Sequence, residues 1–326
     1  MNSNNKKFLT FAVSAVALLV LPLVLQGVGH AWVRILDTAL LYILLALGLN
    51  IVVGFAGLLD LGYVAFYAVG AYLFALLGSP HLTENIPWVA AHFPNGLHTP
   101  IWLAIPLGAG LAAMAGVLLG APTLKLRGDY LAIVTLGFGE IIRVFLNNLD
   151  NPVNLTNGPK GIDRIDPLTV FGVSLGEPWE VMGHTLPPVT LHYYLFLSLV
   201  VLAVVICLRL QHSRLGRAWR AIREDEIAAK AMGLNTRNLK LLAFGLGASF
   251  GGVAGVLFAS FQGFVSPESF SLQESVLVVA MVVLGGLGHI PGVILGAFLL
   301  AALPEVLRHV AGPLQALTGG RLDASI

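Results

Sequence analysis

The sequence predicts an all-α integral membrane protein, a polytopic helical bundle of about nine transmembrane helices within a range of eight to ten. Two observations carry this prediction. Of the 326 residues, 57% are hydrophobic and only 11% are charged, whereas a typical soluble domain has about 25% charged residues. Between Phe8 and Leu59 the only Asp, Glu, Lys or Arg side chains are Arg34 and Asp37. Such stretches cannot cover a soluble surface and belong in lipid.

Each predicted helix follows an apolar run near the length of about 20 residues that crosses a bilayer. The last apolar stretch, 275–304, contains no Asp, Glu, Lys or Arg, and Gly285 to Gly292 interrupt it. It is too long for one untilted span, so it predicts two helices around a Gly/Pro break. A single helix over 275–304 would reduce the predicted total from nine transmembrane helices to eight. The other predicted helices are 8–28, 33–53, 58–77, 101–121, 130–149, 191–208 and 241–262.

Composition and motifs exclude several classes of function. A net charge of +1 provides no basic surface for nucleic acid. Cys207 is the only cysteine, so an intrachain disulfide is excluded, and the histidines show no metal-ligand spacing. The dipeptide Gly-Lys is absent, and with it any phosphate-binding loop. The sequence therefore predicts a chain that is not an enzyme and that holds no metal or cofactor.

The distribution of Lys and Arg predicts the topology, because cytoplasmic loops carry an excess of these residues. The segment 209–240 is the most cationic of the chain and is assigned to the cytoplasm. Counting helices backwards places the N-terminus inside and the loop 78–100 outside, and also places 150–190 outside. The loop 150–190 is a mild exception to the rule, because it carries Lys160 and Arg164 although it is assigned to the outside. The cations behind these assignments are Lys6, Lys7, Lys125, Arg127, Lys160, Arg164, Arg209, Arg214, Arg217, Arg220, Arg223, Lys230, Arg237 and Lys240.

Segment 209–240 also contains a predicted amphipathic helix. Leu215, Trp219 and Ile222 recur at helical spacing, and an acidic cluster, 224–226, follows the basic residues. An apolar stripe exposed where no lipid covers it favours docking to another protein. The alternative is a basic loop on anionic headgroups that only sets topology. That alternative leaves the acidic cluster and the segment 228–233 unexplained.

Two further groups are candidates for a translocation path. Gly57 and Gly62 interrupt the start of the third helix around Asp60. A carboxylate inside the membrane marks a functional site by default, and interrupted helices expose backbone groups to substrate. The alternative is that Asp60 caps the following helix at the interface. Glu140 and Arg143, three residues apart, could contact substrate or form a structural salt bridge, which the spacing favours.

Glycines within the apolar runs suggest close helix contacts. In 107–116, small residues recur four apart, a spacing that lets helix backbones approach in lipid. The alternative is that membrane helices are simply rich in Gly. Outside the helices, Asn157 to Ile162 forms a cluster of turn-forming residues and predicts a rigid loop.

Several of these segments, in this order, resemble the permease subunits of bacterial branched-chain amino-acid ABC transporters. A set of long motifs along one chain is more specific than any single motif. The segments that carry the resemblance are Gly57 to Tyr72, Leu124 to Arg143, Asn157 to Ile162, Gly216 to Gly233 and Val283 to Gly288.

The resemblance implies that the cytoplasmic segment contains a coupling helix that docks to a separate ATPase. Ala228-Ala229 followed by Gly233 fits part of the docking signature of importers, whereas Glu226 and Ile227 depart from it. The residues assigned to docking are Arg217, Trp219, Arg220, Arg223, Glu224, Glu226, Ala228, Ala229 and Gly233.

The resemblance further implies an assembly in the bacterial inner membrane. Residues 1–326 would form a single transmembrane permease domain, paired with a homologous second permease. Two ATP-binding subunits would carry MgATP, and a periplasmic amino-acid-binding protein would deliver substrate. The candidate path residues are Gly57, Asp60, Gly62, Glu140 and Arg143.

Three alternatives stay open. A urea or short-amide permease of the same superfamily is the nearest, and an ion-coupled secondary amino-acid transporter would leave the docking segment unexplained. A membrane-embedded enzyme would need a catalytic group that the sequence does not show. Members of the family usually continue past a segment like Leu303 to Arg308 into another apolar helix, whereas this chain stops at Ile326.

Overall fold

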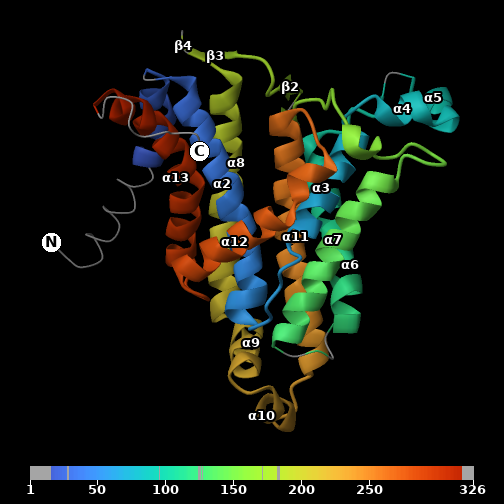
Figure 1. Cartoon of the computed structure of the whole chain (residues 1–326), viewed down its shortest axis with the longest axis vertical. Helices are drawn as coiled ribbons and strands as arrows, with labels where there is room; N and C mark the ends of the chain where they lie inside the picture. Colours follow the sequence, from blue (N-terminus) through green and yellow to red (C-terminus); the bar gives the residue numbers. More distant parts are fainter. Residues whose placement is uncertain are drawn as a thin grey trace.

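A computed structural model describes residues 16–27, 29–94, 96–123, 126, 128–170, 172–181 and 184–317. Most of the described chain is helical, and short strands occur at one end only (Figure 1). The membrane-length elements are α2 (His30–Asn50) with its extension η1 (Ile51–Phe55), α3 (Val64–Leu77), α6 (Ile101–Thr123), α7 (Asp129–Asn148), α8 (Pro188–His212), α11 (Thr236–Gln262), α12 (Leu272–Gly285) and α13 (Ile290–Leu317).

The described helices confirm the predicted membrane bundle. Six of them are long and apolar enough to cross a membrane, and two shorter apolar helices, Val16–Gln26 and α3, accompany them. Helix α7 has 20 residues and carries Asp129, Glu140 and Arg143. With α7, the six long helices and the two shorter ones make nine membrane helices among the described residues. The beginning of the first predicted helix, 8–15, and the cations Lys6, Lys7, Lys125 and Arg127 lie outside the described residues.

Short elements mark the two ends of the molecule. At one end, here the hairpin end, the strands β1 (Thr169–Val170) and β2 (Val173–Ser174) pair, as do β3 (Trp179–Val181) and β4 (His184–Leu186). The helices α4 (His81–Asn85) and α5 (Pro87–His92) lie at the same end (Figure 1). At the opposite end, here the basal end, lie α9 (Arg214–Glu224) and α10 (Glu226–Ala231).

Two pairs of helices share one construction. The spanning helix α2–η1 is followed by the non-helical segment 56–63 and the 14-residue helix α3. The spanning helix α11 is followed by the segment 263–271, which contains the short turn η3 (Pro267–Phe270), and by the 14-residue helix α12. Because α2–η1 ends and α11 begins at the basal end, the two pairs run in opposite directions. The predicted helix 58–77 is thus corrected: it begins at Val64.

Small residues allow close contact between α11 and its neighbours, as the spacing four apart predicts. A Cβ added at Gly108 of α6 would lie 2.5 Å from Val256 Cγ2, and one added at Gly116 would lie 2.6 Å from Ala248 Cβ. Gly110 of the same run has open space around it. Gly108 and Gly116 therefore serve packing, and Gly110 reflects only the composition of the helix.

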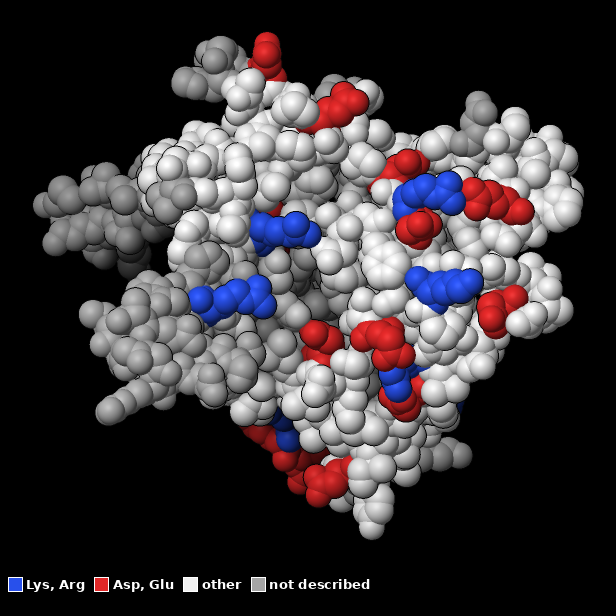
Figure 2. Space-filling model, turned by 45° about the horizontal axis from the view of Figure 1, so that its top comes forward, with Lys and Arg blue, Asp and Glu red and all other residues white. Residues whose placement is uncertain are grey.

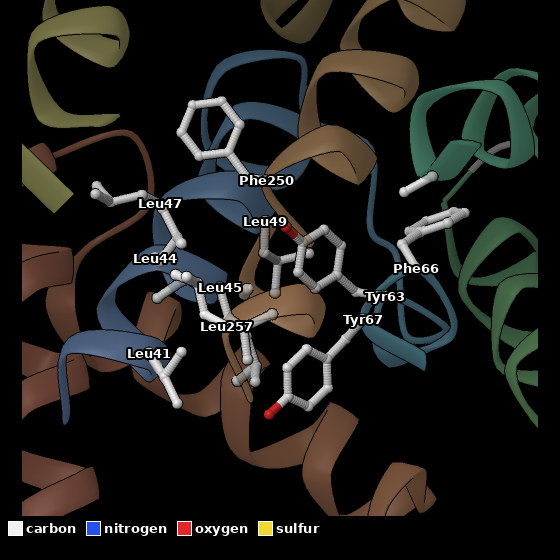
Figure 3. Close-up of a cluster of buried hydrophobic side chains, with 14 of the residues drawn as sticks. Leu41, Leu44, Leu45, Leu47, Leu49, Tyr63, Phe66, Tyr67, Phe250 and Leu257 are labelled. Atoms are coloured by element: carbon white, nitrogen blue, oxygen red, sulfur yellow. The ribbon is translucent and has the colours of Figure 1, made fainter. Parts of the chain in front are cut away.

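The apolar core lies where α2, α3 and α11 meet. Figure 3 shows leucines of α2 facing Tyr63, Tyr67, Phe250 and Leu257. The buried Tyr63 hydroxyl donates a hydrogen bond of 2.9 Å to the Gly247 carbonyl, so the phenol is satisfied without water. This contact holds the start of α3 against the middle of α11.

The predicted break in the last apolar stretch is confirmed. Helix α12 ends at Gly285 and α13 begins at Ile290, with Gly286 and Gly288 at positive φ between them. Gly292 approaches the Gly285 carbonyl too closely for any side chain. A tight reversal therefore joins the two helices at the basal end.

Candidate functional site

The basal end carries a compact helical platform, formed by α9 and α10. Ser213 caps α9 by accepting a 3.2 Å hydrogen bond from Gly216 N. Asp225 caps α10 by accepting bonds of 2.8 and 3.0 Å from the amides of Ile227 and Ala228. Side-chain caps satisfy amides that a helix start leaves without partners. Both helices therefore have ordered starts although each is short.

Trp219 faces the interior of the chain. Its side chain is fully buried, and Nε1 donates a 2.8 Å hydrogen bond to the Leu239 carbonyl of α11. Ile222 is also buried, and Leu215 is half-buried. The prediction of an exposed apolar stripe on α9 is therefore wrong, because the start of α11 covers it. Trp219 anchors the platform.

Arg223 joins the platform to the end of the first helix pair. Its Nη1 donates a 2.5 Å hydrogen bond to the Gly54 carbonyl in η1. Its side chain also lies directly on Gly57, where an added Cβ would come 2.7 Å from Arg223 Cγ. Gly57 has φ +70°, a conformation that favours glycine. Gly57 thus provides the surface on which α9 rests.

The same contact region includes the α12–α13 turn. Asn50 Oδ1 accepts a 2.8 Å hydrogen bond from Gly288 N, and Gln211 Nε2 donates one of 3.4 Å to the Gly288 carbonyl. Arg223 Nη1 lies near Gly288 as well, because a Cβ added there would be 3.3 Å from it. The platform therefore contacts both helix pairs at once.

The remaining charged residues of the platform have different partners. Arg217 and Arg220 donate to the carbonyls of His212 and Gln211, near the end of α8, where cations are favourable. Glu226 Oε2 lies 2.7 Å from Lys240 Nζ, and the Lys240 side chain is only 6% exposed. Glu224 is exposed. Through these contacts the side chains of Arg217, Arg220 and Glu226 stabilise the platform, although they also lie at its surface.

The outer face of α10 is the part of the platform that remains open. Ala228 is exposed and Ala229 is buried. Gly233 follows the helix at φ +84° with no atom within 4 Å of an added Cβ, so it is the left-handed residue that ends α10. Ile227 and Met232 are 67% and 83% exposed. The sequence analysis did not name Met232, and it named Ile227 only as a departure from the docking signature.

Asp60 lies in the segment between η1 and α3 and is 1% exposed. Oδ1 accepts a 2.9 Å hydrogen bond from Gly62 N, a local turn that the sequence does not distinguish from a helix cap. Oδ2 has no hydrogen-bond partner within the described residues. The carboxylate is thus only half satisfied, which is costly inside a membrane.

The two interrupted helix pairs touch beside Asp60. Ser275, in the first turn of α12, donates a 2.5 Å hydrogen bond to the Leu61 carbonyl. Gly62 packs directly on the Thr135 carbonyl of α7. A cavity of only about 20 Å³ separates the two pairs there, enough for about one water. The two helix pairs are therefore in close contact beside Asp60.

Glu140 and Arg143 form the structural salt bridge that their spacing favours. Arg143 donates 3.1 and 2.6 Å hydrogen bonds to Glu140 Oε1, and its Nη1 donates one of 2.8 Å to Glu268 Oε2 of η3. The triad thus fastens segment 263–271 to α7. Glu140 also lines the small central cavity.

The candidate path residues are not gathered into one site. Gly57 lies with Arg223 at the basal end, Asp60 and Gly62 lie at the central contact, and Arg143 bonds to η3. A cavity of about 400 Å³ opens beside the platform and is lined by both Gly57 and Arg223. No group of three or more His, Cys, Asp or Glu side chains suited to a metal occurs within the described ranges.

Apolar helices long enough to span a membrane, two antiparallel interrupted helix pairs and a platform attached to both are the architecture of a multi-pass membrane protein, and interrupted helices of this kind occur in transporters. Residues 31–318 match the family described as the branched-chain amino acid transport system permease component. The chain therefore belongs to this family, and with its apolar helices it is a multi-pass protein of the inner membrane.

Individual relatives agree with the family. The high-affinity branched-chain amino acid transport system permease protein LivM of Escherichia coli is 46% identical over 305 residues, which cover 90% of this chain and 67% of that protein. LivM of Salmonella typhimurium is 45% identical over the same shares. LivH of Salmonella typhimurium is 27% identical over 79% of each chain. No solved structure matches the chain significantly.

Proposed function

We propose that this chain is the non-catalytic, membrane-spanning subunit of an ATP-driven importer of branched-chain amino acids. The observation that carries the proposal is the α9–α10 platform. It projects from the basal end (Figure 1), exposes Ile227 and Met232, and is bonded through Arg223 to the first helix pair. Such an element can receive a push from a partner and pass it into the bundle.

The substrate and the other subunits follow from the relatives. Two relatives are named as LivM and LivH permeases of branched-chain amino acid transport, which supports a homologous second permease beside this chain. The importer would include two ATP-binding subunits that hold MgATP and a periplasmic amino-acid-binding protein. The N-terminus and the platform would face the cytoplasm, and the hairpin end would face the binding protein. The urea and short-amide alternative finds no support among the named relatives.

The platform favours an ATP-driven importer over an ion-coupled transporter. An ion-coupled carrier needs no capped helices outside the bundle, whereas a docking surface needs an ordered face with apolar anchors. Ile227 and Met232 would provide those anchors, because both side chains are largely exposed. Docking residues with inward contacts, such as Trp219 and Arg223, would act by holding the platform on the bundle.

The test is to replace the exposed anchors by a charge, in Ile227→Asp and Met232→Asp. Removing an anchor from an interface commonly costs about 2 kcal/mol or more, so we expect co-purified ATPase and ATP-dependent leucine uptake to fall at least about tenfold. Both anchors are solvent-exposed, so the variants should insert and fold normally.

The matched control is Val153→Asp, which places the same charge on an exposed apolar residue outside the platform. It should keep the co-purified ATPase, because the substitution lies away from the platform. Leucine uptake by the unaltered chain that persists without any ATPase would contradict the proposal and favour the ion-coupled alternative.

A further inference from the structure

Charged side chains are exposed about halfway through the bundle, where α7 meets η3. Glu140 lies near the middle of the 20 residues of α7, and its side chain is 43% exposed. Glu268 of η3 is 64% exposed and shares Arg143 with Glu140. On the side of the molecule turned to the viewer in Figure 2, acidic side chains lie next to a basic one below the hairpin end. These charges are therefore open to whatever surrounds the bundle at that depth.

The start of α12 lies at a similar depth. Tyr42 is near the middle of the 26-residue span His30–Phe55, and its hydroxyl donates a 2.8 Å hydrogen bond to Glu274 Oε2. Helix α12 has 14 residues, so it is about 21 Å long, whereas the hydrocarbon core is about 30 Å thick. Since α12 ends at the basal end, it must begin inside the membrane. The residues here called the mid-depth face are Glu140, Arg143, Glu268, Gln273 and Glu274.

The outward sides of two other spanning helices have a different character. Helix α6 contains no Asp, Glu, Lys or Arg and exposes Met114 and Leu118. Helix α8 contains none before Arg209 and exposes Leu202 and Val205. Apolar sides of this kind are compatible with acyl chains, whereas an exposed carboxylate at the bilayer centre is costly. Lipid can therefore cover α6 and α8, but it does not suit the mid-depth face.

An apolar stripe continues from the mid-depth face towards the basal end. It consists of exposed side chains on one side of α12, at positions four and seven residues apart or adjacent to these. The residues of the apolar stripe are Leu272, Val276, Val283 and Leu284. Because the stripe begins beside Gln273 and Glu274, whatever covers the charged residues lies against α12 as well. A partner surface with an apolar contact and a hydrated polar margin fits this combination.

We propose that the apolar stripe packs against the second, homologous permease and that the mid-depth face lines a water-filled path between the two chains. The inference rests on the proposed import function, in which the ATPases and the binding protein lie outside the membrane. Only the second permease lies within it and can separate these charges from lipid. A homologous chain spans the same membrane thickness, so its own mid-depth residues would lie opposite. Glu140, Glu268 and Glu274 then stay hydrated.

The first experiment maps the contact in the full transporter, with its second permease, ATPases and binding protein, in native membranes. A photo-crosslinking phenylalanine analogue replaces Val276 or Leu284, two turns apart on the apolar stripe. Irradiation should give a product with the combined mass of the two permeases, identified by a different tag on each. Two positions are used so that a variant that fails to assemble does not decide the outcome. The analogue at Leu202 or Met114, which are 54% and 55% exposed, is the control and should give no such product.

The second experiment tests the water-filled path. Gln273→Cys places a thiol at an exposed position of the mid-depth face, and it should react with a small charged methanethiosulfonate in the assembled transporter. Leu202→Cys should stay unreacted, because a charged reagent does not enter acyl chains. The unaltered chain is the background, since its Cys207 is fully buried.

The outcomes separate this inference from the proposed function. A transporter that imports leucine with ATP, yet joins its second permease through Leu202 or Met114 and not through Val276 or Leu284, would overturn the contact. Crosslinks from the stripe to a second copy of this chain would overturn it too. An unreactive Gln273→Cys in the assembled complex would remove the path. An unaltered chain that never co-purifies with a second permease would instead contradict the proposed function.

Discussion

At the scale of single residues, the amino-acid types in the α9–α10 platform did not predict the direction in which each side chain points. Trp219 and Arg223 occur in one amphipathic helix, yet one fills the interface with α11 and the other reaches η1. Both arrangements satisfy a polar group that would otherwise be unpaired near the membrane surface. Arg223 joins the platform to η1 of the first helix pair, so its removal should separate docking from transport.

We expect Arg223→Ala to lower ATP-driven uptake about tenfold or more while the ATPase subunits remain bound. The lost bond is charge-assisted and is worth about 2 kcal/mol, and it alone connects α9 to the Gly54 carbonyl. Uptake and ATP hydrolysis are measured on the same proteoliposomes. Arg237→Ala, an exposed arginine at the start of α11, is the control. A parallel loss of bound ATPase would show that Arg223 acts in docking instead.

At the scale of elements, glycines allow particular pairs of helices to pack closely. Gly252 of α11 faces Gly108 and Ala112 of α6, and an added Cβ would come 2.5 Å from Ala112 Cβ. Neither backbone can withdraw without losing contacts along both helices, because interiors are close-packed. Helix α11 is therefore the central element of the bundle: it also packs on α2 through Gly247, next to Gly48.

Gly252→Val should therefore destabilise the permease strongly. Overpacking a well-filled contact costs about 1–3 kcal/mol, and here the clash is with a backbone carbonyl, so a drop of several degrees in detergent melting temperature is expected. Gly110→Ala adds a methyl group where no atom lies within 4 Å and should melt like the unaltered protein. Equal melting of the two variants would show that α6 and α11 are not in close contact.

At the scale of the whole molecule, two antiparallel helix pairs and one platform define an axis through the membrane. The hairpin end and the basal end must lie on opposite sides, because α2, α8 and α11 run between them. Cys207 is fully buried in α8, so the unaltered chain provides a silent background for labelling added cysteines.

Glu177→Cys and Lys230→Cys should report opposite sides in intact cells. Both positions are exposed, one in the loop between β2 and β3 and the other on α10. A membrane-impermeant maleimide should label Glu177→Cys from outside, and Lys230→Cys only after the inner face is made accessible. The unaltered chain should stay unlabelled. Labelling of Lys230→Cys from outside would reverse the topology and remove the proposed docking.

The sequence alone determined the membrane bundle, the break between 285 and 290, the Glu140–Arg143 salt bridge and the position of the helical platform. These features depend on local composition and on residues three or four apart, which a single segment contains. Residues 58–63 were assigned to the third helix because apolar residues continue through them, whereas the structure has a non-helical segment there in which Gly62 packs on the Thr135 carbonyl of α7.

Only the tertiary structure decided which side chains are buried and which are exposed. The burial of Trp219, the exposure of Met232 and the hydrogen bond from Tyr42 to Glu274 all depend on elements distant in sequence. Helical periodicity defines a face of a helix but does not say what covers it. Tyr42 can donate a hydrogen bond to Glu274 because α2 and α12 pack against each other, although the two residues are 232 positions apart.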